Sequence, residues 1–413
     1  MGQRSARRSA RVLGLLLLAA LVSAPGALAD PPPLVIVLSW DGVRRDYPDR
    51  GEFPALARMA REGVRAERLA SVFPANTFPA HVSMATGTYP DRHGIVGNRF
   101  RDRERGLFDY DNDASWIEAE PLWAAAERQG RRAAVFFWVG SETDWNGIGA
   151  SYRKTPFDSA VSEEQKVDQI LAWIDLPAAQ RPALIMSWWH GTDRAGHRKG
   201  PDHDDVARAL AEQDRQLERL FAGLDRRDAW RHATVFVVSD HGMTLAREFV
   251  DLKGPLAKHG IAAEVLSSSG AAYLYLEDAG DLDRAESLLR SLPDVEVYRA
   301  GALPERLRLD HPARIGDLVA VAAPPSTFSR SRLPAFLGGT RGMHGYAPEH
   351  PDMAAIFFAL GRGVPRGRAL GPVRSIDLAP TVAALLGIEP PRHSEGRPIP
   401  GIGVDGASSL PGS

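Results

Sequence analysis

Short runs of apolar and β-branched residues alternate along this chain with longer stretches of helical periodicity. A nearly continuous apolar run is typical of a strand that is buried on both faces of a parallel sheet. Strands that alternate with helices predict crossover connections. The expected fold class is therefore α/β, with a doubly wound, mostly parallel sheet sandwiched by helices. The apolar runs cover residues 34–38, 132–139, 183–189, 233–238 and 354–360, and the helical patterns cover residues 53–62, 121–129, 163–174, 206–224 and 376–386.

Aspartates stand beyond the carboxyl ends of several of these apolar runs. Asp41 follows the first run, Asp193 follows the run that ends at residue 189, and Asp240 follows the run that ends at residue 238. In doubly wound sheets, ligands bind beyond the carboxyl ends of the strands. A single aspartate in this position could simply cap the next helix, but the repeated placement favours a shared site.

Histidines accompany these aspartates at spacings that suit metal binding. His197 lies four residues after Asp193, which places both side chains on one face of a helical turn, although such pairs are also common on solvated helices. His241 is adjacent to Asp240, and His344 stands in the segment RGMHGY. Together with the first aspartate and one hydroxyl, these residues can hold two divalent metals and one nucleophile. The set favours phosphoryl or sulfuryl transfer over redox chemistry.

Thr77 is the candidate nucleophile. It precedes Phe78 and Pro79, and proline is favoured in the first turn of a helix. Thr77 should therefore lie at a helix N-terminus, where backbone N–H groups and the helix dipole favour an anion. A metal on its oxygen would lower the pKa of the hydroxyl and supply an alkoxide. The alternative is that Thr77 only caps the helix.

Residues 244–338 differ in pattern from the rest of the chain, with turn clusters, short alternating runs and one helix-like stretch. We expect a smaller α+β subdomain inserted between the Asp240-His241 pair and His344. The catalytic α/β core should then comprise residues 30–243 and 339–392. Residues 393–413 are rich in Pro, Gly and Ser, which predicts a flexible tail.

Residues 1–29 have the pattern of a cleaved secretory signal peptide. Several arginines precede an apolar stretch of about eleven residues, and Ala27-Leu28-Ala29 offers a small-x-small cleavage site. The alternative is a membrane anchor, but about 20 apolar residues are needed to span a bilayer. The chain has no Cys, which suits a secreted or periplasmic bacterial protein better than a eukaryotic ectodomain. No transmembrane segment is expected in the mature chain.

The charge balance excludes a strongly basic surface. Lys+Arg number 50 and Asp+Glu number 52, which gives a formal net charge of -2. A nucleic-acid-binding protein usually carries a basic field, so the expected partner is a small molecule. No feature of the sequence indicates an oligomeric state.

Several segments resemble one known family when they are taken together and in order. The stretch SVFPANTFPAHVSMATGTYPDRHGIVGN is similar to the nucleophile region of the nucleotide pyrophosphatase/phosphodiesterase family, within the alkaline phosphatase superfamily. The segments WDG before it, and WVGSE, SDHGM, MHGY and IDLAPTVAALLGI after it, fit the same family. The resemblance covers nearly the whole mature chain. It implies an alkaline-phosphatase-like α/β sandwich with a bimetallic site that usually holds zinc.

The resemblance also implies roles for individual residues. One metal would be held by Asp193, His197 and His344, and the other by Asp41, Asp240 and His241, with Thr77 as the nucleophile between them. Asn98 would donate a hydrogen bond to a phosphate oxygen beside the backbone N–H of Phe78. Zinc is the expected metal, while the ligand types alone leave manganese or a mixed site open. The implied reaction is a double in-line displacement through a phospho-threonine.

The expected substrate is a small phosphodiester or a nucleotide that contains a phosphodiester or pyrophosphate bond. Phe78, Trp188 and Tyr152 are the candidate aromatic residues for binding a base or another leaving group, with Asn98 on the phosphate. The alternative reading of Trp188 is ordinary core packing at a strand end. The segment WWHGT before Asp193 departs from the acidic or aliphatic approach that is common in the family, which leaves a preference for nucleotides open.

Two further functions compete with this prediction. A phosphomonoesterase or phosphonate hydrolase of the same superfamily is the first, and Arg44 or Arg45 would then be the cation that embraces a doubly charged phosphoryl group. A sulfatase is disfavoured because the chain has no Cys for a formylglycine. A non-catalytic metal- or phosphate-binding protein is the remote alternative, and it is disfavoured because every ligand position and the nucleophile position are filled.

Overall fold

The structure is a computed structural model that describes residues 32–328 and 341–403 of the 413-residue chain. The expected signal peptide, residues 1–29, lies outside the described residues. Residues 329–338 of the expected insert and residues 404–413 of the expected tail also lie outside them.

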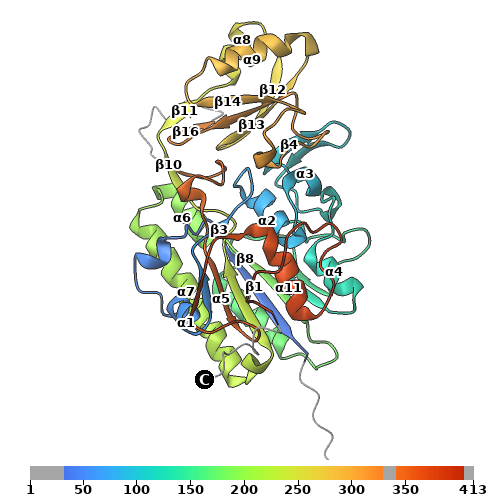
Figure 1. The fold of residues 1–413 in the computed structure, drawn as a ribbon, viewed down its shortest axis with the longest axis vertical. Helices are drawn as coiled ribbons and strands as arrows, with labels where there is room; N and C mark the ends of the chain where they lie inside the picture. Colours follow the sequence, from blue (N-terminus) through green and yellow to red (C-terminus); the bar gives the residue numbers. More distant parts are fainter. Residues whose placement is uncertain (1–31, 329–340, 404–413) are drawn as a thin grey trace, which may run out of the picture. The chain divides into compact units, whose positions relative to one another are not determined.

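The main sheet has eight strands in the order β19-β2-β18-β9-β1-β8-β6-β7 (Figure 1). β1 (Leu34–Trp40) is hydrogen-bonded in parallel to β8 (Leu184–Trp189) on one side and to β9 (Ala233–Val238) on the other. β6 (Ala133–Phe136) and β7 (Tyr152–Lys154) continue the parallel arrangement beyond β8. The predicted α/β fold with a mostly parallel sheet is confirmed.

One predicted strand runs in the opposite direction to the others. β18 (Phe357–Gly361) pairs antiparallel with both β9 and β2 (Val64–Ala66), while β19 (Arg368–Leu370) is parallel to β2. The apolar run at 354–360 was expected to be a parallel strand, and that direction is wrong. A strand that is covered on both faces has the same apolar composition in either direction, so its sequence cannot reveal the direction.

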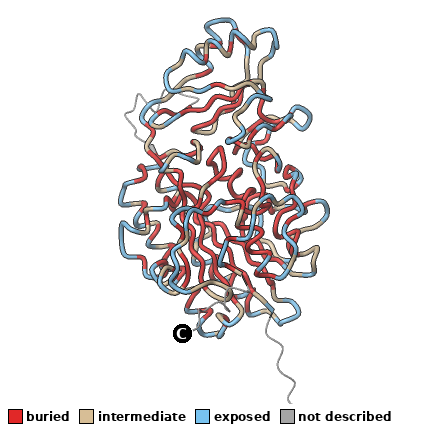
Figure 2. The backbone as a smooth tube through the Cα atoms, viewed as in Figure 1, coloured by how far each residue is buried: buried red, intermediate tan, exposed pale blue. Residues whose placement is uncertain are grey.

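Helices cover both faces of the main sheet, and alternate residues of β1 point into the two layers. Leu34, Ile36 and Leu38 belong to one hydrophobic cluster, and Val35 and Val37 belong to the other. The first cluster includes residues of α1 (Pro54–Glu62), α5 (Glu163–Ile174) and α7 (Asp204–Arg226), and the second includes residues of α2 (Thr77–Thr86), α4 (Leu122–Arg128) and α11 (Leu378–Leu386). The strands between the layers are buried almost throughout (Figure 2).

A second sheet lies within the span that was expected to form an insert. It contains four antiparallel strands in the order β12-β13-β15-β14, which pack with α8 and α9 around a separate hydrophobic cluster. The elements are α8 (Lys253–Lys258), β12 (Ala263–Ser268), β13 (Ala271–Leu276), α9 (Leu282–Arg290), β14 (Val295–Arg299) and β15 (Leu318–Ala322).

Short ladders mark where the chain enters and leaves this insert. β10 (Thr244–Ala246), which begins three residues after His241, pairs antiparallel with β17 (Arg341–Met343), which ends directly before His344. The remaining short elements are β3 (Leu69–Ala70), α3 (Pro90–His93), β4 (Arg99–Asp102), β5 (Gly106–Asp109), β11 (Glu248–Val250), β16 (Ser326–Phe328) and β20 (Val373–Arg374).

Residues 393–403 differ from the flexible tail that was expected there. Ile399 and Ile402 are buried in the same hydrophobic cluster as α11. The backbone N–H of Ile399 donates to Thr381 Oγ1 at 2.8 Å, and Glu395 forms an ion pair with Arg308 at 2.7 Å. The Pro and Gly content suggested low order. Instead, Ile399 and Ile402 fix this segment to the core, and Glu395 joins it to Arg308 of the expected insert.

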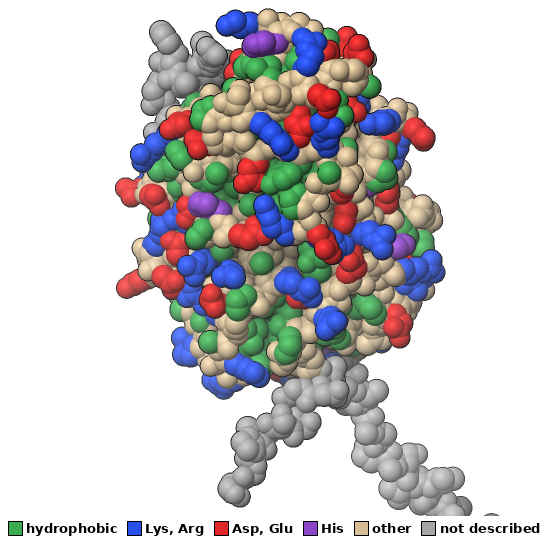
Figure 3. Space-filling view, turned by 45° about the horizontal axis from the view of Figure 1, so that its top comes forward, with side chains coloured by type: hydrophobic (Ala, Val, Ile, Leu, Met, Phe, Trp, Pro, Cys, Tyr) green, Lys and Arg blue, Asp and Glu red, His purple; other side chains and the backbone are tan. Residues whose placement is uncertain are grey.

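The described helices include none that is long and apolar enough to cross a bilayer. On the face shown in Figure 3, acidic and basic side chains are interspersed.

Arg314 of the insert joins three segments near Asn98, the residue that is expected to bind a phosphate oxygen. Its Nε donates to Asp102 Oδ2 at 2.8 Å, and its Nη1 donates to the carbonyls of Gly94 at 2.7 Å and Trp116 at 3.0 Å. The side chains of Arg314 and Asp102 are only 3% and 7% exposed. The guanidinium holds the pKa of Asp102 below its usual value, against the opposing effect of burial.

We predict that Arg314→Met lowers the free energy of unfolding by about 3–5 kcal/mol, because a carboxylate with little access to water loses its cation. Denaturant unfolding followed by circular dichroism measures this loss. Arg103→Met is the matched control: the Arg103 side chain is 58% exposed and pairs with Asp317, so its loss should cost about 0–1 kcal/mol. Equal destabilisation by the two substitutions would contradict the buried role of Arg314.

Candidate metal centre at the carboxyl edge of the main sheet

The carboxyl ends of three neighbouring parallel strands carry the predicted ligands. Asp41 is the residue after β1, and Asp240 and His241 follow the end of β9. α6 (Gly191–Lys199) begins two residues after β8 and carries both Asp193 and His197 on successive turns. Because β8, β1 and β9 are adjacent and parallel, these ends meet at one edge of the sheet.

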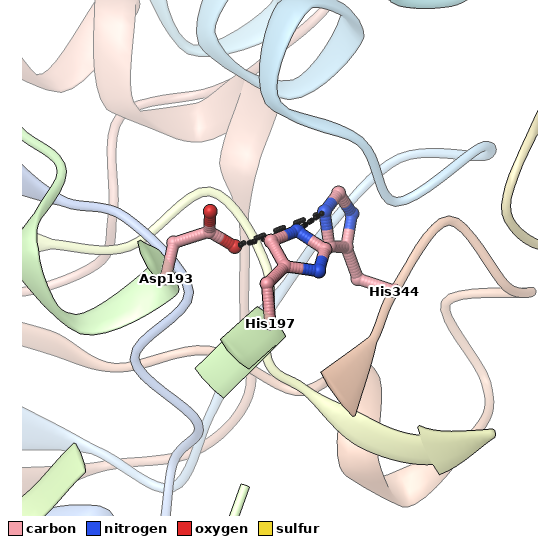
Figure 4. A group of neighbouring side chains, drawn as sticks. All are labelled: Asp193, His197 and His344. Atoms are coloured by element: carbon pink, nitrogen blue, oxygen red, sulfur yellow. Dashed lines mark hydrogen bonds and ion pairs between the residues drawn. The ribbon is translucent and has the colours of Figure 1, made fainter. Parts of the chain in front are cut away.

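The structure brings Asp193, His197 and His344 together as one group. Their ligand atoms lie within 4.8 Å of one another, and in Figure 4 the carboxylate and the two imidazoles turn toward a common point. Asp193 Oδ1 is 3.3 Å from His197 Nε2 and 3.8 Å from His344 Nε2. The two Nε2 atoms are 3.1 Å apart.

Asp41, Asp240 and His241 form a second group with the same spread of ligand atoms, within 4.8 Å. His241 Nε2 lies 3.2 Å from Asp240 Oδ2 and 3.5 Å from Asp41 Oδ1. The rings of His241 and His344 stack with their centroids 3.7 Å apart, so the two groups are immediate neighbours. Both groups have the membership that the resemblance implied.

Backbone carbonyls fix the orientation of all three imidazoles. The Nδ1 atoms lie 2.8 Å from Gly342 O for His197, 2.9 Å from Gly242 O for His241, and 3.0 Å from Ala75 O for His344. A carbonyl oxygen can only accept a hydrogen bond, so each Nδ1 carries a proton, and Nε2 is the nitrogen whose lone pair is available in the neutral ring. This is the arrangement in which a histidine binds a metal through Nε2.

The electrostatics of the two groups fit bound cations. Asp41 Oδ1, Asp193 Oδ1 and Asp240 Oδ2 are buried and have no hydrogen-bond donor among the described residues. Burial raises the pKa of Asp240 to about 8 and also raises the pKa values of Asp41 and Asp193, and it lowers the pKa of His241 to about 3. A cluster of buried oxygen and nitrogen lone pairs is costly unless a cation neutralises it. The donor set, which contains carboxylates and imidazoles without sulfur, fits divalent metals such as zinc.

Thr77 opens α2 beside the second group. Its Oγ1 lies 3.4 Å from His241 Nε2, and the residue is 8% exposed. Asn76 occupies the N-cap position, and its side chain reaches Ser268 Oγ at 3.0 Å instead of capping the helix. Thr77 itself therefore does not serve as the cap, which was the alternative for this residue.

Asn98 is close to Thr77, but one expected donor beside it is already engaged. The backbone N–H of Phe78 donates to Asn98 Oδ1 at 2.9 Å. Because a backbone N–H can only donate, this contact fixes the amide with its Nδ2 group directed elsewhere, 3.5 Å from Tyr110 Oη. The Phe78 N–H, which was expected to bind a phosphate oxygen, instead orients Asn98 in this structure.

The two other predicted aromatic residues have different positions. Trp188 is 9% exposed, stacks on Phe157 and donates from Nε1 to Asp41 Oδ2 at 2.8 Å, so it touches a ligand directly. Tyr152 is not brought to the ligands: its hydroxyl donates to Gln180 O at 2.9 Å, and its ring lies against Trp173. Tyr152 begins β7, which is the edge strand of the main sheet, and no strand was predicted there.

Tyr110 is an aromatic residue at the site that the sequence did not reveal. Its ring meets the ring of Phe78 edge to face with centroids 5.4 Å apart, and the residue is 58% exposed. Its backbone has φ of 52°, a left-handed conformation that is uncommon outside glycine. No spacing or periodicity marks a turn residue of this kind, so only the fold identifies it.

His81 contacts both the backbone of Thr77 and a candidate ligand. It is fully buried, its Nδ1 lies 2.8 Å from Thr77 O and 3.4 Å from Asp240 Oδ2, and its ring packs against Trp138 and Trp188. His81 therefore packs in the core of the protein and also contacts the candidate site.

Arg44 is committed to other partners. It pairs with Asp46, Asp202 and Asp352 and donates to Met243 O at 2.9 Å. Arg45 is exposed and contacts none of the ligands. Neither arginine occupies the position of a cation that would embrace a phosphoryl group.

Comparison with known proteins agrees with this geometry. Residues 35–347 match the family model of type I phosphodiesterase / nucleotide pyrophosphatase. An ectonucleotide pyrophosphatase/phosphodiesterase of Caenorhabditis elegans is 30% identical over 87% of this chain, which corresponds to 43% of that protein. An uncharacterized pyrophosphatase/phosphodiesterase of Schizosaccharomyces pombe is 31% identical over 85% of this chain and 76% of its own length. The bis(5'-adenosyl)-triphosphatase enpp4 of Xenopus laevis is 30% identical over 86% of this chain and 78% of its own length.

Solved structures support the same assignment. Murine ectonucleotide pyrophosphatase / phosphodiesterase 5 superposes with a TM-score of 0.79 at 27% identity, over 86% of this chain and 95% of that one. The chain therefore belongs to the type I phosphodiesterase / nucleotide pyrophosphatase family, whose members are hydrolases of phosphodiester and pyrophosphate bonds.

Proposed function

We propose that this protein is a metal-dependent phosphodiesterase or nucleotide pyrophosphatase that works through a phospho-threonine on Thr77. The observation that carries the proposal is the position of the Thr77 hydroxyl, which lies at the first residue of α2 and 3.4 Å from the Nε2 of a candidate metal ligand. An N-terminal helix position favours the negative charge of an attacking oxygen and of a phosphate.

Two divalent cations, with zinc as the first choice, would be held by Asp193, His197 and His344 and by Asp41, Asp240 and His241. When bound, they would act as Lewis acids that stabilise both the attacking and the leaving oxygen of an in-line displacement. The Nδ1–H contacts to Gly342, Gly242 and Ala75 would hold the three imidazoles in the orientation that binding requires.

The reaction would proceed in two displacements. Thr77 loses its hydroxyl proton to solvent, its Oγ forms a bond to phosphorus, and the bond from phosphorus to the leaving alcohol or nucleotide oxygen breaks. Water then forms a new bond to phosphorus, the Oγ–phosphorus bond breaks, and Thr77 regains a proton. Asn98, held through Oδ1 by the Phe78 N–H, would present its Nδ2 group to a phosphate oxygen.

A substrate with a flat leaving group fits the residues around Thr77. The exposed ring of Tyr110 lies next to Asn98 and offers aromatic surface to a base, and the buried ring of Phe78 supports it edge to face. Trp188 remains a candidate contact for the substrate, although its N–H is engaged by Asp41. One solved relative, murine ectonucleotide pyrophosphatase / phosphodiesterase 5, has a structure of an inactive form in complex with AMP, and a nucleotide is therefore our first choice of substrate.

The decisive experiment compares two chromogenic esters with the zinc-loaded protein. We expect strong hydrolysis of the p-nitrophenyl ester of thymidine 5'-monophosphate and little hydrolysis of p-nitrophenyl phosphate, because no described cation is placed to embrace a second phosphoryl charge. Release of p-nitrophenolate measures both rates. A preference for the monoester would establish a phosphomonoesterase instead. If the metal-loaded protein hydrolyses neither ester, the substrate would be a phosphonate or another diester, or the protein would be a binding protein.

Thr77→Ala should reduce turnover of the diester by at least about 10³-fold, because it removes the attacking oxygen. Thr77→Ser keeps a hydroxyl at the same place and should retain measurable turnover. Intact-protein mass spectrometry after acid quenching should detect a phosphoryl adduct in the wild-type chain and none in Thr77→Ala. An adduct in the alanine variant, or near-wild-type turnover in a folded sample of it, would remove Thr77 from the mechanism.

His344→Ala should lower the zinc content of the purified protein from about two ions per chain to about one, since a three-residue site loses one ligand. Elemental analysis gives the content. His259→Ala is the control, because His259 lies exposed in the insert. Retention of both ions in His344→Ala would refute the ligand assignment.

A further inference from the structure

Residues 188–190, the last two residues of β8 and the one residue that links it to α6, form a turn that contacts Asp41. Trp188 donates from Nε1 to Asp41 Oδ2 at 2.8 Å, and the carbonyl of Trp189 accepts from the Asp41 N–H at 2.9 Å. Asp193 lies in the first turn of α6, immediately beyond. The contacts of this turn therefore set the position of the Asp41 carboxylate, whereas Asp193 is held by α6 itself.

The contact from Trp188 also fixes which oxygen of Asp41 can bind a cation. Oδ2 is occupied by the indole N–H, while Oδ1 has no donor and lies 3.5 Å from His241 Nε2. The indole thus prevents rotation of the carboxylate and directs Oδ1 toward the group. Contacts of this kind around a metal ligand commonly change metal affinity when they are removed.

Lys166 of α5 lies directly behind this turn. The residue has 0% exposure, and its Nζ donates to the carbonyl of Trp188 at 3.0 Å. The ring of Phe137 is 6.0 Å away, and Glu163, one turn earlier on α5, supplies the favourable charge. Among the described residues, the Trp188 carbonyl is the one hydrogen-bond acceptor of this ammonium.

Stability does not explain a lysine at this place. A buried ammonium with one neutral acceptor loses most of its hydration, and burial lowers its pKa to about 8. An apolar side chain of similar length would fill the same space without that cost, and such replacements of buried charges are often neutral or stabilising. The role of the ammonium should therefore be to hold the carbonyl that it contacts in place.

Other polar side chains reach the same turn from the helical layer. Gln213 of α7 lies 3.5 Å from the carbonyl of Trp189 through Nε2, and its Oε1 accepts from the hydroxyl of Thr192. His190 Nδ1 and Glu163 Oε1 are buried nearby without partners among the described residues. Lys166 is the one full positive charge among these contacts, and its acceptor belongs to the residue that holds Asp41.

We propose that Lys166 is a positioning residue for the metal centre: it holds the Trp188 carbonyl so that the Trp188 indole orients Asp41 for metal binding. This inference rests on the proposed two-metal function and assigns a role to a residue that contacts neither a metal ligand nor the nucleophile. It predicts that loss of the ammonium weakens the cation site of Asp41, Asp240 and His241 and spares the other site.

Zinc affinity, measured by competition with a chromophoric chelator, tests the proposal on the full protein. Lys166→Met keeps an unbranched side chain without charge, and Trp188→Phe keeps a ring without the N–H. Each should weaken the binding of one of the two zinc ions by about 10–100-fold. The double variant should lose no more than the more affected single variant, since both substitutions break the same chain of contacts. Lys258→Met, at an exposed position of α8, is the control and should bind both ions as the wild type does.

The outcomes separate this inference from the function on which it rests. A wild-type chain that binds no zinc would refute the proposed metal centre, whereas normal binding in Lys166→Met would refute only the role of Lys166. Equal weakening of both ions, or fully additive losses in the double variant, would assign Lys166 to general stability and overturn the proposal. If Lys166→Met does not fold, Lys166→Arg is used: it keeps a donor and should retain both affinities within a few-fold, and selective loss of one ion in that variant would also overturn it.

Discussion

Repulsion among three carboxylates at one edge of the main sheet is the constraint on which this structure depends. Asp41, Asp193 and Asp240 are gathered at the ends of adjacent strands, and each has an oxygen without a donor. Burial raises their pKa values, so the arrangement is unfavourable unless cations occupy it. The surrounding structure is organised to accept cations: three imidazoles turn Nε2 inward because backbone carbonyls hold Nδ1. The fold holds these carboxylates close together, and their repulsion has to be offset by cations, which the chain itself does not supply.

Much of the fold could be predicted from the periodicity of the apolar residues. The candidate ligands could be found in the same way, because most of them stand just beyond the ends of predicted strands. Helix α5 has the predicted bounds, and β9 ends where the Asp240-His241 pair was expected to emerge. The direction of β18 could not be predicted, since a strand covered on both faces has the same apolar composition whether it is parallel or antiparallel to its neighbours. Tyr110 and the contact between Phe78 and Asn98 were also missed, because they arise from a left-handed turn and from loops that meet only in the folded chain. The tail was misjudged because composition was given more weight than its two isoleucines.

The two sides of the site differ in how their geometry is maintained. On the side of Thr77, the first turn of α2 is fixed by Asn98 and by His81, which lies within reach of both Thr77 O and Asp240. On the opposite side, Lys166 of α5 and Gln213 of α7 contact the backbone carbonyls of Trp188 and Trp189. The helical layers therefore do more than cover the sheet. They supply buried polar contacts that hold strand-end residues against the repulsion at the centre.

The position of the insert has a consequence for the order in which the site is assembled. Asp41, Asp240 and His241 all precede the insert in the chain, whereas His344 follows it, just after β17 pairs with β10. During synthesis from the N-terminus, one complete set of ligands exists before the insert emerges, and the other set waits for its last histidine. The insert therefore lies within the chain segment that closes the group of Asp193, His197 and His344, and outside the segment that closes the group of Asp41, Asp240 and His241.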